Sequence, residues 1–103
     1  MAYVLRFIQH YKPAHRQGFL DIEAKFRNLE RRLPNFPQAR RSQPVAGGEP
    51  THSLIWECEF AGLEDVQNAL TELANDPTHA ELFEEQSPYI TELRTELFEI
   101  LEL

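Results

Sequence analysis

The chain has 103 residues, of which 42% are hydrophobic and 26% are charged, and this balance is typical of a single globular domain rather than a disordered chain. Its net charge of −7 disfavours nucleic acid as a partner, because contacts with phosphate need clustered positive charge. One cysteine excludes an internal disulfide framework and no apolar run approaches the ~20 residues that cross a bilayer, so we expect a cytoplasmic domain over residues 1–103 with no membrane partner.

The first two predicted elements are a strand and a helix. Residues 3–11, YVLRFIQHY, alternate in apolar character with a period of two, which predicts a strand that ends before Pro13. Spacings of three and four then predict an amphipathic helix over residues 14–33, with an apolar face made of Phe19, Ile22, Phe26, Leu29 and Leu33. The prolines in LPNFP end this helix.

The centre of the chain predicts a hairpin. QARRSQPV, residues 38–45, is a weak strand signal, and AGGEP after it has the glycine and proline content of a connection. HSLIWECEF, residues 52–60, is the strongest strand in the chain, with Leu54, Trp56, Cys58 and Phe60 on one side and Ser53, Ile55, Glu57 and Glu59 on the other.

A second helical region and a further strand complete the pattern. Leu63, Val66, Leu70, Leu73, Ala80 and Phe83 recur at helical spacing. Asp76 as an N-cap and Pro77 in a first turn predict that the helix restarts there, and it should end near residue 87. The segment ITELRTELFEILEL favours a helix by propensity, but we assign it as a strand because the sheet needs a fourth partner.

This order of elements predicts an α+β, ferredoxin-like βαββαβ fold with two helices on one face of a four-stranded antiparallel sheet. In the usual strand order, 4-1-3-2, the first and third strands are neighbours. If their facing residue numbers sum to 63, then Phe7 faces Trp56 on the helix side, and Arg6 faces Glu57 on the reverse side.

The reverse side of this sheet carries too many apolar groups for a solvated surface. Its charged residues must also be paired if they leave water, so replacing Arg6 should leave Glu57 without a counter-charge. We therefore expect a second copy of the chain to cover this side in a two-fold homodimer. The candidate interface residues are Arg6, Ile8, Ile55, Glu57, Arg94, Glu96 and Phe98.

Over its whole length the chain resembles the dimeric α/β-barrel superfamily. The resemblance lies in the opening strand YVLRF before a proline-started helix, in LIWECEF followed by AGLEDV, and in NDPTHAELFEEQSPYI before a closing strand. It implies that the sheets of two copies pack into a shared barrel with the helices outside. Members include monooxygenases that act on polyketides or haem, isomerases and proteins of unknown role, so the fold alone does not settle the chemistry.

Two functions therefore stay open: a homodimeric protein that binds a small molecule between helices and sheet, and a small cofactor-independent or haem-related monooxygenase or isomerase. The candidate ligand pocket consists of Phe7, Phe26, Trp56, His79 and Tyr89. His79 and Glu57 are the candidate catalytic groups, because histidine titrates near neutrality and Glu57 lies on the covered face. Each also has an ordinary structural interpretation, as a capping histidine and as half of an ion pair.

Other reactive residues carry weaker signals. The histidines and Cys58 are not spaced as metal ligands, so we expect no metal, and no fingerprint of a cofactor site is present. Cys58 lies on the apolar side of its strand and should be an inert small hydrophobe. The pairs Arg31–Arg32 and Arg40–Arg41 suggest either a basic patch for an anionic ligand or ion pairs within the fold.

Overall fold

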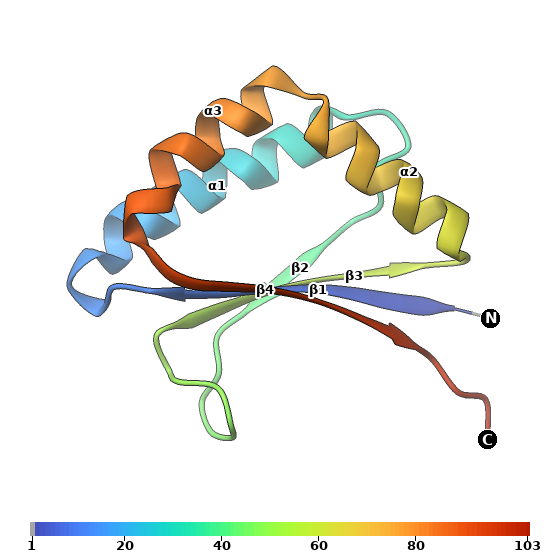
Figure 1. Ribbon diagram of the computed structural model, residues 1–103, viewed down its shortest axis with the longest axis horizontal. Helices are drawn as coiled ribbons and strands as arrows, with labels where there is room; N and C mark the ends of the chain where they lie inside the picture. The colour runs from blue at the N-terminus through green and yellow to red at the C-terminus, as the bar shows by residue number, and fades with distance from the viewer. Residues whose placement is uncertain (1) are drawn as a thin grey trace.

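One four-stranded antiparallel sheet carries all the helices on a single face (Figure 1). The computed structural model describes residues 2–103. Its elements are β1 (Tyr3–Tyr11), η1 (Pro13–His15), α1 (Arg16–Arg32), β2 (Arg40–Ser42), β3 (Ser53–Phe60), α2 (Leu63–Ala74), α3 (Pro77–Gln86), η2 (Ser87–Tyr89) and β4 (Ile90–Glu99). The strand order is β2-β3-β1-β4, so the predicted α+β ferredoxin-like topology is confirmed.

The register between β1 and β3 is the one that the alternation predicts. Phe7 pairs with Trp56, Arg6 with Glu57 and Ile8 with Ile55. On the other edge of β1, Arg6 pairs with Glu96. Because side chains alternate along a strand, this register separates an apolar helix-facing side from a mixed reverse side.

The first helix has the expected apolar face. Phe19, Ile22, Phe26 and Leu29 are buried, as their spacing predicts. The α-helix begins at Arg16 rather than at residue 14, since residues 13–15 form a short 3-10 turn. Glu23 is buried in the same face, which the apolar pattern alone does not explain.

The second helical region is two separate helices. The Asp76 side chain accepts a hydrogen bond of 3.0 Å from the backbone N–H of His79, so the predicted N-cap is confirmed. The prediction that Phe83 lies on the buried face of α3 was wrong. Phe83 is 43% exposed, and the buried residues of this helix are Leu82 and Gln86. The break at residues 75–76 gives α3 a new axis, so the phase of α2 does not continue into it.

The closing segment is a strand, as assigned, over residues 90–99, and residues 100–103 lie outside it. β2 is only three residues long, shorter than the weak signal at residues 38–45 suggested.

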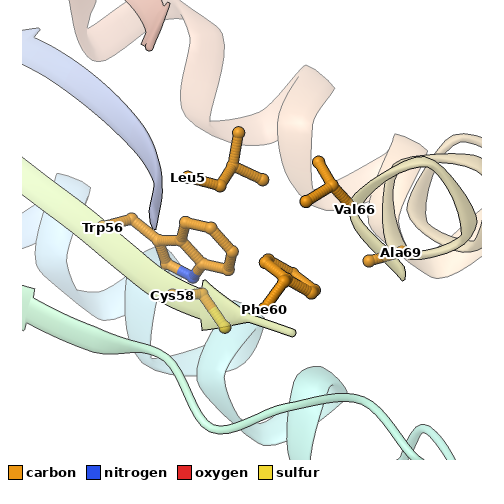
Figure 2. Packing of buried hydrophobic residues seen from close by; sticks show 6 residues of the cluster. All are labelled: Leu5, Trp56, Cys58, Phe60, Val66 and Ala69. Atoms are coloured by element: carbon orange, nitrogen blue, oxygen red, sulfur yellow. The ribbon is translucent and has the colours of Figure 1, made fainter. Parts of the chain in front are cut away.

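The main core lies between α2 and the sheet. Figure 2 shows Val66 and Ala69 of α2 pointing toward Leu5 and Phe60, with Trp56 and Cys58 beside them on β3. Burying side chains of this kind contributes roughly 25 cal/mol per Å² of apolar surface. A second cluster around Phe26 and Leu82 joins α1 to α3. Between these two clusters the helices leave a cavity.

Candidate functional site

A cavity of about 250 Å³ lies between the helices and the sheet. For comparison, an apolar cavity of about 150 Å³ holds benzene, so this one has room for a larger ligand. Apolar side chains form most of its wall: Phe7, Phe26, Trp56, Leu70, Leu73, Ala74, Phe83 and Leu93. The polar groups in its wall are Gln9, Glu23, Glu30, Arg41, His79, Gln86 and Thr95.

Four of the five predicted pocket residues meet at this cavity. Phe7 and Trp56 stack on the sheet with ring centroids 4.6 Å apart. Phe26 of α1 meets the edge of the His79 ring of α3 at 5.1 Å. The cavity therefore has an aromatic floor from β1 and β3 and an aromatic wall from two helices.

Tyr89 does not line the cavity, so its predicted place in the pocket is corrected. It lies in η2 and packs near Tyr11 and Phe19, with its ring centroid 5.5 Å from that of His15. A Cβ placed on Gly18 would lie 3.3 Å from the Tyr89 ring, which shows how closely α1 passes over it. The η2 turn returns the chain to the sheet beside the start of α1, and this separates Tyr89 from Trp56.

A buried ion-pair network forms the polar end of the cavity. The Arg41 Nε donates to Glu23 Oε2 at 2.6 Å, and its Nη1 and Nη2 donate to the two carboxylate oxygens of Glu30 at 3.2 and 2.7 Å. The side chains of Arg41, Glu23 and Glu30 are only 16%, 5% and 12% exposed. One guanidinium thus joins β2 to α1 by charge-assisted hydrogen bonds.

Two further donors complete this network. The Gln86 side-chain amide donates to Glu23 Oε1 at 2.9 Å, and Trp56 Nε1 lies 3.2 Å from Glu30 Oε2. The carboxylates of α1 are therefore held from β2, β3 and α3 at once. Two carboxylates share one guanidinium, so the network carries a net negative charge.

Of the two interpretations that the sequence left open for the pair Arg40–Arg41, the structure shows ion pairs within the fold, although the sequence did not identify their partners. Arg40 and Arg41 side chains alternate across β2, so they point to opposite faces of the sheet and do not form one basic patch. Arg41 binds Glu23 and Glu30, and Arg40 binds Glu57. The available signal was Glu23 itself, an acid three residues before Phe26 within the apolar stripe of the helix.

Gln9 adds an unpartnered acceptor to the cavity wall. Its side chain is 8% exposed, and its Oε1 is buried without a hydrogen-bond partner among residues 2–103. A buried carbonyl oxygen without a partner costs free energy, roughly 1–3 kcal/mol. The atom has almost no accessible surface, so a ligand in the cavity would meet other parts of the Gln9 side chain.

His79, a polar residue predicted for the pocket, lines the cavity from α3. Burial lowers the pKa of its imidazole below the ordinary value, although the charges of Asp76, Glu30 and Glu23 oppose that shift. The ring is therefore neutral near neutral pH and can accept a proton.

Glu57, the other catalytic candidate, lies on the reverse side of the sheet and does not share a site with His79. Burial raises its pKa, but hydrogen bonds from Arg40 and Arg6 outweigh this effect and hold the pKa below its ordinary value. The nearest contacts are 2.9 Å to Arg40 and 3.1 Å to Arg6. This is the geometry of a structural ion pair.

The chain's own β2–β3 connection covers part of the reverse side. In Figure 1 this connection, residues 43–52, projects from the sheet on the side away from the helices. Glu49 within it bonds to Arg94 and lies 2.8 Å from His10 Nε2. Ile8 is consequently only 4% exposed in a single chain. It is therefore not available to contact a second copy, contrary to what the sequence had suggested.

The remaining candidate interface residues stay on the reverse side. Phe98 is 43% exposed, and the Arg6 guanidinium carbon lies 4.9 Å from the centre of its ring. Arg94 lies 2.9 Å from Glu92 and 4.0 Å from Glu96, and Ile55 lines a shallow groove under the β2–β3 connection. This part of the surface is both apolar and charge-balanced.

Other reactive groups show no site of this kind. Cys58 is 2% exposed, and burial together with the charge of Glu30 raises its pKa to about 11. Within residues 2–103, no three His, Cys, Asp or Glu side chains are grouped as metal ligands. None of the helices in that range is long and apolar enough to span a membrane.

Comparison with known proteins identifies the fold. No protein-family model and no curated protein sequence matches the chain. Among solved structures, a NIPSNAP family protein from Agrobacterium tumefaciens is similar at a TM-score of 0.80 and 16% identity, over 99% of this chain and 95% of the other. A NIPSNAP-like domain protein from Burkholderia xenovorans is similar at 0.80 and 16%, over 97% and 85%.

A third similar structure is an enzyme. SnoaB, a cofactor-independent oxygenase from Streptomyces nogalater, is similar at a TM-score of 0.68 and 13% identity, over 99% of this chain and 95% of the other. The solved structures to which the chain is similar thus include NIPSNAP and antibiotic-biosynthesis-monooxygenase-like proteins, and the ferredoxin-like fold expected from the sequence is confirmed. At these identities the likeness concerns the fold.

Proposed function

We propose that the protein binds a small, largely apolar molecule in the cavity between its helices and its sheet. The observation that carries this proposal is a mostly apolar cavity of about 250 Å³ whose wall also includes the polar side chains of Gln9, His79 and Thr95. Ligand sites in proteins are typically apolar clefts with a few polar groups that fix orientation.

The wall also limits the charge of the ligand. Arg41 gives its guanidinium to Glu23 and Glu30, so it is not available to an anion. The net negative charge of this network disfavours a carboxylate or phosphate nearby. The best fit is a neutral ligand that places an apolar body against Trp56 and one polar group against the polar part of the wall.

A second candidate function is proton transfer on such a ligand, in an oxygenase or isomerase reaction that needs no cofactor. The observation that favours it is His79, a cavity residue whose pKa burial lowers, so that a neutral base faces the ligand. SnoaB, which has the same fold, is a cofactor-independent oxygenase. In this proposal His79 is the catalytic base, and Glu57 has a structural role on the reverse side.

We also propose that the working form is a homodimer in which a second copy covers the reverse side of the sheet. Supporting observations are the exposure of Phe98 and the half-buried ion pair of Arg6 with Glu57 beside it. Since the β2–β3 connection already covers Ile8, the second copy would contact the part around Arg6, Ile55, Arg94, Glu96 and Phe98.

A titration of the Trp56 indole N–H signal by nuclear magnetic resonance tests the ligand proposal, because this is the single tryptophan and it lines the cavity. Naphthalene, 2-naphthol and 2-naphthoate are suitable probes that share a body but differ in donor and charge. We expect a saturable shift with naphthol, a weaker one with naphthalene and none with naphthoate.

Two variants make this test specific. Ala74→Phe adds bulk to the cavity wall and should abolish the naphthol shift, whereas Val45→Phe, at a loop position that is 92% exposed, should not. If no neutral probe shifts the indole signal, or if Ala74→Phe binds as the wild type does, the cavity is not a ligand site.

A further inference from the structure

We propose that the β2–β3 connection, residues 43–52, is fastened to the reverse side of the sheet by a proton-controlled latch, made of His10, Glu49, Glu92 and Arg94. While His10 carries a proton, the latch holds the connection over the sheet, and loss of that proton releases it. This inference goes beyond the proposed function, because it concerns a movement within one chain rather than the cavity or a contact between copies.

Both ends of the connection are fixed to the rest of the chain. At its start, the Arg16 Nη2 donates to Gln43 Oε1 at 2.9 Å. At its end, the Tyr11 N–H donates to the His52 carbonyl at 3.0 Å. A movement of the connection would therefore involve the residues between these ends, 44–51.

The residues between these ends are held to the sheet at one point. None of residues 44–51 is buried, and within the part of the chain that the structure describes their side chains bind the sheet through Glu49. A shallow groove remains between the connection, which projects away from the helices in Figure 1, and Ile8 beneath it. Since close apolar packing does not hold the connection in place, its position depends on the contacts of Glu49.

Both ring nitrogens of His10 face a carboxylate. Its Nε2 lies 2.8 Å from Glu49 Oε2, and its Nδ1 lies 3.0 Å from Glu92 Oε2. Only a protonated imidazole carries a hydrogen on both nitrogens. The neutral ring can donate to one carboxylate but turns a lone pair toward the other, which repels it. The two contacts together therefore fit the protonated ring.

The charges of the latch balance only when His10 is protonated. Arg94 lies 2.9 Å from Glu92 and also bonds to Glu49. Two carboxylates thus face one guanidinium and one imidazole, so the net charge is zero with the protonated ring and −1 with the neutral ring. The other titratable neighbour, His52, lies edge-on with its ring centroid 6.3 Å from that of His10.

The latch should open as the pH rises. Histidine ordinarily loses its proton between about pH 5 and 8. Hydrogen bonds from His10 and Arg94 hold the pKa of Glu49 below its ordinary value, so this carboxylate stays charged over that range. The closed form contains the protonated ring, so its stabilisation is present at the acidic end and is lost toward the alkaline end. Release would uncover Ile8, which is 4% exposed, beside Ile55 in the groove.

Relaxation of the Ala46 methyl group, measured by nuclear magnetic resonance, follows the latch because Ala46 lies in the connection above the groove. Its order parameter should fall from about 0.85 at about pH 5.5 to below about 0.6 at about pH 8, which is the range of a flexible segment. Ala69, buried in the main core, should stay rigid at both pH values. An Ala46 that is equally rigid, or equally mobile, at both would overturn the proposal.

Glu92→Gln separates the latch from a general loss of order at higher pH. An amide at this position can donate to the unprotonated Nδ1 of His10 while Nε2 keeps its hydrogen for Glu49, so the connection should stay ordered up to about pH 8. His10→Gln should show no transition in this range, whereas His52→Gln, the control, should keep that of the wild type. A wild-type transition in Glu92→Gln or His10→Gln, or its loss in His52→Gln, would assign the movement to another group and overturn the latch.

Discussion

Arg41 is the shared counter-charge of two buried carboxylates of α1, so its loss should destabilise the protein far more than the loss of its neighbour. Arg41→Met leaves Glu23 and Glu30 without their shared counter-charge, and we expect the free energy of unfolding to fall by ~3–5 kcal/mol. Urea unfolding followed by the fluorescence of Trp56 would measure this change.

Arg40→Met is the matched control at the residue scale. The Arg40 side chain is 80% exposed, and Glu57 keeps its contact with Arg6 when Arg40 is replaced. Exposed ion pairs contribute about 0–1 kcal/mol, so this variant should unfold almost as the wild type does. Equal losses in the two variants would mean that the buried network does not stabilise the fold.

The aromatic residues of the site could be predicted from the sequence, but the ion-pair network at its polar end could not. Phe7 and Trp56 follow from period-two alternation, and Phe26 follows from helical spacing. The position of Gln9 on the helix side of β1 could be predicted in the same way, since it lies two residues from both Phe7 and Tyr11. The partners of Glu23 and Glu30 could not be predicted, because they come from three other elements whose long side chains meet only after packing.

At the scale of elements, the Asp76 cap should set the stability of α3. Asp76→Ala removes the acceptor for the His79 N–H and should cost about 1 kcal/mol. Asn75→Ala, one residue earlier, changes an exposed side chain with no such role and should be close to neutral. Thermal unfolding by circular dichroism would separate the two. If both variants melted alike, the cap would not contribute.

Element types and strand register could be predicted, but helix phase and loop direction could not. The register of β1 and β3 follows from placing apolar residues opposite apolar ones. The buried face of α3 does not follow from the spacing in α2, because a break between helices resets the axis. Likewise, the glycines and prolines of residues 43–52 indicate a turn, but not that Glu49 reaches His10 on the reverse face.

At the scale of the whole molecule, the structure changes what a variant of Arg6 would reveal. The sequence suggested that Glu57 depends on Arg6 alone. Arg40 also donates to Glu57 Oε2, at 2.9 and 3.0 Å, so Arg6→Ala leaves that carboxylate with a partner. The exposed apolar group of this face, Phe98, is therefore a sharper place to test whether a second copy covers it.

Phe98→Lys should weaken the contact between reverse faces. On the reverse face it would place a charge where two sheets meet, and uncompensated burial of charge is strongly unfavourable. Light scattering across a dilution series should show the wild type above 12.0 kDa, at twice that mass or more, and Phe98→Lys at a lower mass. Leu63→Lys, at an exposed position on α2, should match the wild type. A Phe98→Lys variant that keeps the wild-type mass at every dilution would mean that the reverse face is not where subunits meet.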